Sequence, residues 1–247
     1  DIDLDPFIDN TFSAADPVIA IEGTLDGNKV LGFFGGEIGD YYATERLTVS
    51  SGATLTLASE VELRVRDLRI YGRMVMPDAT LRYYSSSGYD YVAVYPGGEL
   101  VVSGSTIYSD SDRVYVHDGG YAELIGATLN DVLWEYRAGS SGVVEGNTGA
   151  DWGVTIQDAS VLVRDNTLSG LRIEAASVVE NNTLNQIVLR APATVTDNML
   201  GWMTVDLSAA DATVTGNTFN GGTPIQLLDP DIDLDPFIDN TFSAADP

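Results

Sequence analysis

VRDNTL, residues 163–168, is the stretch that decides the fold, because close variants of it return throughout the second half of the chain. In each variant an apolar residue is followed, two positions later, by Gly, Asp or Asn and then by an invariant asparagine. The variants are VEGNTG (144–149), VENNTL (179–184), VTDNML (195–200), VTGNTF (214–219) and FIDNTF (237–242). Their asparagines, Asn147, Asn166, Asn182, Asn198, Asn217 and Asn240, are separated by 19, 16, 16, 19 and 23 residues. A unit of this length cannot bury an apolar face alone, so the spacing predicts stacked coils.

The middle of the chain repeats with a different phrase. VAVYPGGELVVSGSTI (92–107) aligns with VYVHDGGYAELIGATL (114–129) at an offset of 22 residues. Upstream, LTVSSGATLTLASEVELRVRDLRIYG (47–72) alternates apolar and polar residues between short breaks that contain Gly or Asp. This period of two indicates β-strands, and the Gly, Asn and Asp positions between them indicate turns.

The recurrent asparagine has a physical reason in such a coil. Asparagine tolerates the left-handed backbone conformation of a tight corner, and its side-chain amide can bond to the asparagines of the coils above and below. We therefore expect each asparagine at a corner, with the apolar residue that opens each phrase stacked inside the core. Those residues are Val144, Val163, Val179, Val195, Val214 and Phe237.

These corner phrases, together with SSGATLTL and PGGELVVSGSTI, resemble right-handed parallel β-helix proteins of the pectin-lyase-like superfamily. They look most like the repeats of large secreted or cell-surface proteins of bacteria and archaea. The resemblance extends from about Thr44 onward. It implies an all-β fold, a right-handed parallel β-helix (β-solenoid) of roughly ten to twelve coils, with residues 1–247 as a single solenoid. A β-sandwich is the competing fold, but the regular asparagine spacing does not follow from it.

The two ends of the chain carry the same seventeen residues. DIDLDPFIDNTFSAADP occupies 1–17 and again 231–247, an offset of 230 residues. We interpret 1–17 as the last coil of a preceding copy and the chain as one 230-residue repeat, cut from a tandem array with nearly identical copies. The continuation after Pro247 is then expected to be VIAIEGTLDG. An artificial overlap and a monomer with two identical ends are the alternatives.

Charge and residue usage exclude several classes of function. Lys and Arg number 12 against 37 Asp and Glu, which gives a net charge of −25 and argues against nucleic acid as a partner. The absence of cysteine excludes disulfides and thiolate chemistry, and the single histidine, His117, argues against a His-rich metal site or triad. Long apolar runs are lacking, so no membrane span is expected. An acidic surface suits a salty or calcium-rich exterior, and we expect a secreted or cell-surface location.

A run of acids near the end of the chain is the candidate metal site. Asp229, Asp231, Asp233 and Asp235 alternate with Pro230, Ile232 and Leu234. In a strand the four carboxylates would face one side and the apolar residues the core. A row of carboxylates suits a hard cation such as Ca²⁺, which is the only cofactor the sequence suggests. The alternative is a solvated acidic face.

Two aromatic segments are the candidates for lateral contact with a neighbouring chain. LGFFGGEIGDYY (31–42) and RYYSSSGYDYVAVYP (82–96) concentrate rings that could stack on another surface. The candidates are Phe33, Phe34, Tyr83, Tyr84, Tyr89 and Tyr91. The alternative is that these segments fold over the flank of the coils, and sugar binding is a further one.

No catalytic constellation stands out. Strand-like spacing in EVELRVRDLRIYGR (60–73) places Glu60, Glu62, Arg64 and Arg66 on one face, which predicts a salt-bridged surface. The resembling family includes lyases that abstract a proton with a basic residue beside a calcium-held uronate, but their motif has no match here. We therefore expect a non-enzymatic structural unit of a long acidic extracellular fibre or surface layer, assembled from identical copies head to tail and perhaps laterally. The alternative is a carbohydrate-active or carbohydrate-binding β-helix, namely a polysaccharide lyase, a hydrolase or an adhesin.

Overall fold

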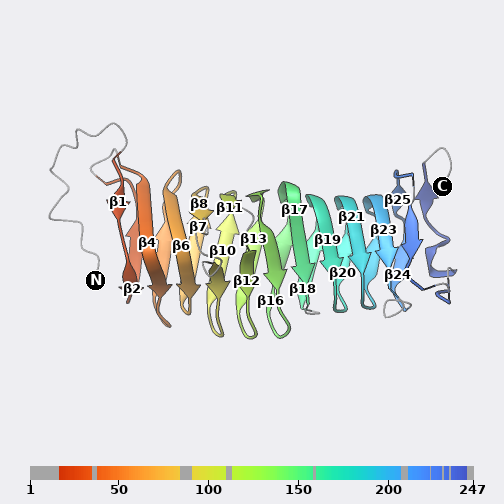
Figure 1. The fold of residues 1–247 in the computed structure, drawn as a ribbon, viewed down its shortest axis with the longest axis horizontal. Coiled ribbons are helices and arrows are strands. Elements are labelled where there is room, and N and C mark those ends of the chain that lie inside the picture. The colour runs from red at the N-terminus through yellow and green to blue at the C-terminus, as the bar shows by residue number, and fades with distance from the viewer. Residues whose placement is uncertain are drawn as a thin grey trace.

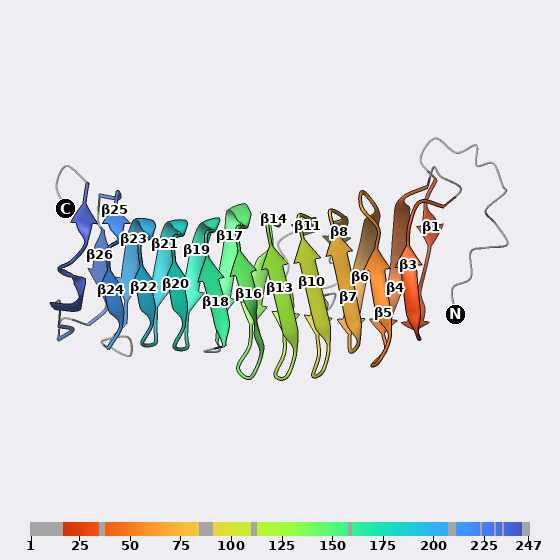
Figure 2. The same cartoon turned by 180° about the vertical axis from the view of Figure 1, so that it is seen from behind.

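The protein is an elongated all-β solenoid in which parallel strands stack in about ten turns (Figures 1 and 2). This computed structural model describes residues 17–34, 38–83, 91–109, 113–157, 160–206, 211–222, 224–229, 231–233 and 235–243, with the backbone alone at 150–152. Every pairing between its named strands is parallel, and the N- and C-terminal ends lie at opposite ends of the long axis. The predicted all-β parallel solenoid is therefore confirmed.

One side of the solenoid is a 10-stranded sheet, here called the narrow sheet, with one strand from each turn. Its strands are β3 (Asn28–Leu31), β5 (Thr54–Leu57), β7 (Arg73–Pro77), β10 (Glu99–Ser103), β13 (Tyr121–Ile125), β16 (Ser141–Glu145), β18 (Val161–Arg164), β20 (Val178–Glu180), β22 (Thr194–Thr196) and β24 (Thr213–Thr215).

The remaining strands form a 17-stranded sheet, here called the wrapped sheet, to which most turns contribute two consecutive segments. Its strands are β1 (Ile19–Ala20), β2 (Gly23–Leu25), β4 (Asp40–Val49), β6 (Glu62–Ile70), β8 (Thr80–Tyr83), β9 (Val92–Val94), β11 (Thr106–Ser109), β12 (Arg113–Val116), β14 (Thr128–Asn130), β15 (Leu133–Tyr136), β17 (Thr148–Ile156), β19 (Thr167–Ile173), β21 (Thr183–Leu189), β23 (Met199–Val205), β25 (Thr218–Phe219), β26 (Ile225–Leu227) and β27 (Thr241–Phe242). A short 3₁₀ helix, η3 (Asp235–Phe237), follows β26.

Strand register follows the sequence repeats. β9 pairs with β12 through Val92 and Val114, and β11 pairs with β14 through Thr106 and Thr128. The 22-residue alignment between 92–107 and 114–129 is thus a stack of two neighbouring coils. In the second half, the valines that open the asparagine phrases pair in series, from Val144 with Val163 to Val195 with Val214.

The core is one continuous apolar column along the axis. Alternation along each strand produces it: in β6, Leu63 and Val65 are fully buried while Arg64 faces outward. The valines of the asparagine phrases are buried as predicted. Burial of a side chain of this size contributes about 1.5–3 kcal/mol, so stability accumulates coil by coil. None of the helical turns in the described residues has the length and apolar composition of a membrane span.

Candidate functional site

A ladder of stacked asparagines runs along one corner of the solenoid, between the narrow and wrapped sheets. The Nδ2 of each asparagine donates to the Oδ1 of the asparagine one coil further on, at 2.8–2.9 Å. The same Oδ1 also accepts the backbone N–H of the preceding asparagine, for example Asn166 N to Asn182 Oδ1 at 2.9 Å. The predicted amide stacking is confirmed from Asn147 to Asn240. Because buried amides are expensive to leave unpaired, this ladder fixes the register of the coils.

The left-handed residue of each corner is not the asparagine, as predicted, but the residue before it. Asp165, Asn181 and Asp197 each have a φ of 57°, and Gly146 and Gly216 take the corresponding place in other coils. The reason is geometric: the asparagine side chain must point into the corner to reach its neighbours, so the preceding residue makes the bend and points to solvent. Asn181 is exposed accordingly.

The corner ladder continues toward the N-terminus with smaller residues, which the sequence reading missed. Ala127 donates its backbone N–H to Asn147 Oδ1 at 2.8 Å. One coil further, Ser105 Oγ accepts the backbone N–H of Ala79 at 2.9 Å and donates to Met76 O at 2.7 Å. The signal was present, since SGST (103–106) aligns with EGNT (145–148).

The acid run does not form the predicted strand. Asp229 Oδ1 accepts the backbone N–H of Asp231 at 2.9 Å, and Asp233 Oδ1 accepts that of Asp235 at 3.0 Å, before η3 begins. Aspartates that bond locally favour turns over strands, and Pro236 cannot donate to a ladder. Within the described ranges, no three Asp, Glu or His side chains converge in a way that could hold a metal ion. The geometry therefore lends no support to a calcium site at Asp229, Asp231, Asp233 and Asp235.

The aromatic candidates for lateral contact divide into two groups. Tyr83 is fully buried at an inward position of β8, and Phe34 is 7% exposed beside an antiparallel bridge to Ile38, so these two belong to the core and their prediction as contact residues is wrong. Phe33 is 46% exposed and Tyr91 is half-buried. Tyr84 and Tyr89 lie outside the described residues.

Some outward rings form a second ladder that the sequence reading did not find. Tyr71 stacks on Tyr95 with centroids 4.5 Å apart, and Tyr95 stacks on His117 at 5.0 Å. Arg137 continues the series, with its Nη1 3.4 Å from His117 Nδ1 and its guanidinium 4.0 Å above the ring of Tyr115. Each ladder residue directly follows a wrapped-sheet strand, which brings it beside its counterpart in the next coil. Burial and then the charge of Arg137 lower the pKa of His117, against the opposing effect of Glu135.

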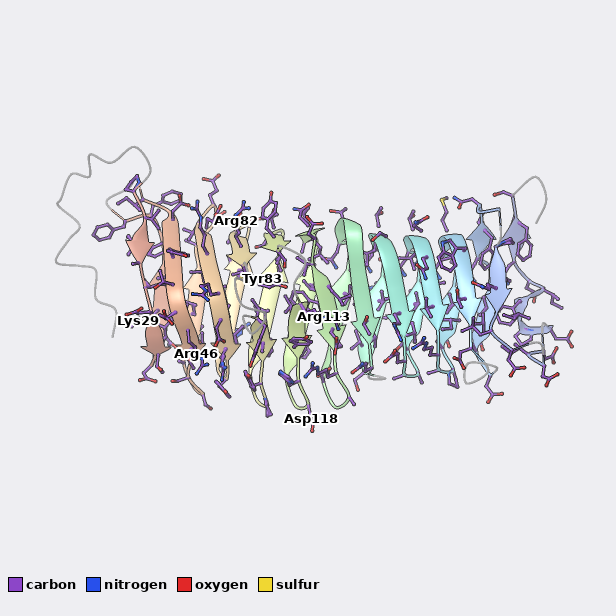
Figure 3. All side chains as sticks on the ribbon, in the orientation of Figure 1. Lys29, Arg46, Arg82, Tyr83, Arg113 and Asp118 are labelled. Atoms are coloured by element: carbon purple, nitrogen blue, oxygen red, sulfur yellow. The ribbon has the colours of Figure 1, made fainter. Side chains whose placement is uncertain are left out.

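Most basic side chains on the surface are bound to acids, which leaves the surface excess acidic. Arg82 and Arg113, in different coils, lie 3.2 and 3.0 Å from carboxylates of Glu62 and Glu135 (Figure 3). Arg64 also reaches Glu62, at 2.6 Å, so the predicted salt-bridged face is present. Glu60 departs from that prediction, because it lies in the corner before β6 with a φ of 65°.

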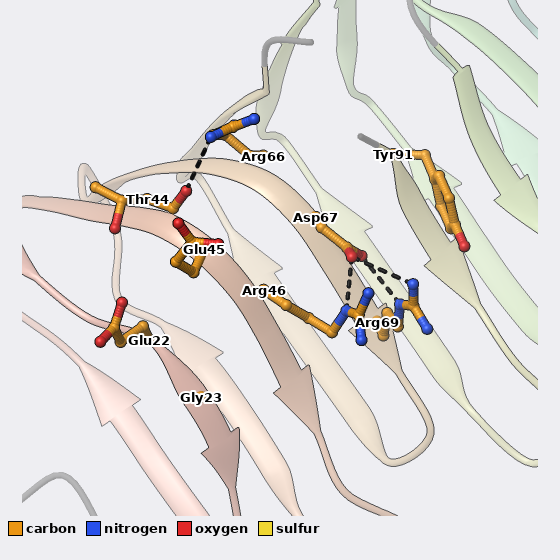
Figure 4. A pocket seen from close by; sticks show the side chains of 9 residues that line it. All are labelled: Glu22, Gly23, Thr44, Glu45, Arg46, Arg66, Asp67, Arg69 and Tyr91. Carbon is orange, nitrogen blue, oxygen red and sulfur yellow. Dashed lines mark hydrogen bonds and ion pairs between the residues drawn. The ribbon is translucent and has the colours of Figure 1, made fainter. Parts of the chain in front are cut away.

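The largest groove lies near the N-terminal end and has a volume of about 780 Å³ (Figure 4). It is lined by Glu22, Gly23, Thr44, Glu45, Arg46, Arg66, Asp67, Arg69 and Tyr91. Asp67, 9% exposed, binds Arg46 Nε at 2.6 Å and Arg69 Nε at 3.1 Å. Burial of Arg69 opposes its charged form, but the hydrogen bond and charge of Asp67 prevail and raise its pKa. The three arginines could hold an anionic group, although Glu22 and Glu45 oppose it.

Comparison of the chain with protein-family models, with curated proteins and with solved structures found no match.

Proposed function

We propose that this chain is a structural unit of a long acidic extracellular fibre or surface layer, assembled from head-to-tail β-helix repeats. The observation that carries the proposal is the pair of identical segments 1–17 and 231–247 on a solenoid whose ends lie at opposite ends of the axis. A solenoid that ends as it begins can be extended by another copy without a change of sequence. The finer proposal is that the fold belongs with the right-handed, pectin-lyase-like β-helices it resembles.

Backbone ladders and the asparagine ladder supply the mechanical basis. Both run along the axis, so each coil presents its edge to the next coil and stretching the fibre would act along rows of hydrogen bonds. About ten turns at ~4.8 Å each give one unit an axial length of roughly 50 Å. Head-to-tail assembly would also cover strand edges that invite uncontrolled pairing when exposed.

Charge supports separate fibres in a salty exterior. The net charge of −25 makes copies repel one another sideways, because the arginines on the flanks are already bound to carboxylates. Lateral bundling would then depend on dissolved cations or on local contacts, for which Phe33 and Tyr91 are the accessible aromatic candidates.

The second candidate function is carbohydrate binding, and the arginine-lined groove is the observation that favours it. Three guanidiniums and Tyr91 offer charge and a ring surface to an acidic sugar. Loss of binding to acidic oligosaccharides on Arg66→Ala would support this candidate over a purely structural role.

The test of the fibre proposal is the intact mass of the native polypeptide after full denaturation. A covalent tandem array has a mass many times 26.4 kDa, whereas separate subunits have a mass near that of one unit. Electron microscopy of undenatured material then distinguishes fibres from monomers. A single-unit mass together with monomeric particles would contradict the proposal.

A further inference from the structure

The C-terminal end of the solenoid is closed by a segment that differs from every other coil. This segment, here called the cap, comprises residues 231–233 and 235–243 (Figure 1). In the narrow sheet, η3 packs against β24 where the next strand would stand. In the wrapped sheet, β27 pairs in register with β25, Thr241 beside Thr218 and Phe242 beside Phe219. The cap therefore covers one sheet edge and extends the other.

Asn240 attaches the cap to the asparagine ladder. Its Oδ1 accepts both the backbone N–H and the Nδ2 of Asn217, each at 2.9 Å. Its Nδ2 donates to Val214 O at 2.9 Å and to Phe237 O at 2.7 Å. The surface that receives the cap thus requires an amide at this position, since it presents donors to one end of the side chain and carbonyls to the other.

Apolar contacts complete the attachment. Phe237 is 3% exposed and Ile232 is 5% exposed, so both are buried against the last coils. The ring of Phe242 stacks on that of Phe219 with centroids 5.2 Å apart and an angle of 10° between planes. These contacts select an aromatic or aliphatic side chain at each of three positions.

Every cap side chain that makes these contacts has an identical counterpart in the head of the chain, residues 1–17. Ile232, Phe237, Asn240 and Phe242 correspond to Ile2, Phe7, Asn10 and Phe12 at the constant offset of 230. We propose that the surface under the cap is a docking site for the head of a second copy, which replaces residues 231–247 of the first by strand exchange. This inference rests on the head-to-tail array proposed above and names the contact that would join its units.

Competition between the two identical segments sets the conditions for exchange. The chain's own tail is tethered beside the docking site, which gives it an effective concentration on the order of millimolar. The head of another copy binds the same surface with the same chemistry but only at its real concentration. Exchange is therefore weak in dilute solution and becomes favourable at high local concentration or when the tail is impaired.

Two single substitutions in the full-length chain separate these roles. Asn240→Asp keeps the size of the side chain but places carboxylate oxygens against Val214 O and Phe237 O, which impairs the tail and leaves the head intact. Asn10→Asp is the matched control, because it makes the same change in the head alone. We expect Asn240→Asp to form head-to-tail oligomers in sedimentation velocity at concentrations at least tenfold lower than the unmodified chain. Asn10→Asp and the double variant should remain monomeric.

A synthetic fluorescent peptide of sequence DIDLDPFIDNTFSAADP gives a second readout. It should bind Asn240→Asp at least tenfold more tightly than the same peptide with Asp in place of Asn10, as measured by anisotropy. Phe242→Ala, at a position 38% exposed, impairs the tail without opening the core and repeats the experiment if Asn240→Asp does not fold; Phe12→Ala is then its control.

Equal oligomerisation of the tail and head variants, or equal binding of the two peptides, would overturn the docking site. That result would leave the intact mass of the native polypeptide unchanged, so a failure of this inference is distinguishable from a failure of the array.

Discussion

Asn182 makes the clearest residue-scale test, because it lies in the middle of the ladder and is 1% exposed. Its Nδ2 donates to Asn198 Oδ1 at 2.9 Å and its Oδ1 accepts two hydrogen bonds from Asn166. Asn182→Ala leaves these partners buried and unpaired, and each such group costs about 1–3 kcal/mol. We expect the free energy of unfolding in urea to fall by roughly 2–4 kcal/mol.

The neighbouring residue is the control. Asn181 is exposed and left-handed, so Asn181→Gly should change the free energy of unfolding by less than about 1 kcal/mol. A larger loss at Asn181 than at Asn182 would mean that the backbone turn, and not the amide ladder, stabilises the corner.

This pair also shows how far the sequence could be interpreted at the residue scale. Recurrence identified the asparagine and predicted its stacking, because a repeated polar residue at a coil period has few other uses. Recurrence could not tell which of two adjacent polar residues makes the bend, since both recur with the same spacing. Tyr83 failed for a related reason: a tyrosine can fill an inward strand position as well as an exposed one, and only the register of β8 decides.

At the scale of elements, the ladder of Tyr71, Tyr95, His117 and Arg137 predicts a pH dependence. The folded protein holds the pKa of His117 below its usual 6.5, because burial and Arg137 disfavour the imidazolium. The unfolded chain therefore takes up the proton first, and this contribution to stability is fully present above about pH 6.5 and is lost as the pH falls through the folded pKa. The chain has one histidine, so NMR titration of the imidazole reports this pKa directly.

Arg137→Gln should move that pKa upward toward 6.5, because it removes the cation beside Nδ1 while keeping a planar side chain of similar reach. Arg172→Gln, which removes an arginine bound to Glu174, is the control and should leave the titration unchanged. A titration of His117 above 6.5 in the unmodified chain would contradict the ladder geometry.

The strand pattern was predictable where alternation is regular, and β6 illustrates this. The acid run failed because alternation of Asp with apolar residues has two physical outcomes. An aspartate can face solvent from a strand, or it can accept its own chain's N–H groups and make turns. Asp229 and Asp233 do the latter, and Pro236 favours it further. The cap, which is the least coil-like part of the solenoid, was therefore the part that periodicity described worst.

At the scale of the whole molecule, the 230-residue identity and the fold support each other. A solenoid can be cut at any coil, so a duplicated terminal segment has a structural meaning that it would lack in a closed globular fold. Sequence analysis could detect the duplication but not that residues 235–237 cover the edge of the narrow sheet. That edge closure depends on a 3₁₀ helix, which no repeat elsewhere in the chain announces.

The net charge of −25 leads to the last prediction, a dependence of stability on dissolved salt. Acidic groups along the solenoid repel one another, and the repulsion is screened beyond about 10 Å at 0.1 M ionic strength. Raising NaCl from low to moderate concentration should therefore raise Tm, and each 1 kcal/mol gained corresponds to roughly 2–4 °C for a domain of this size. Because no described cluster of acids can hold a metal ion, CaCl₂ and MgCl₂ at equal ionic strength should raise Tm equally. A rise specific to micromolar Ca²⁺ would contradict this, since screening depends on ionic charge and concentration but a coordination site discriminates between cations by size and ligand number.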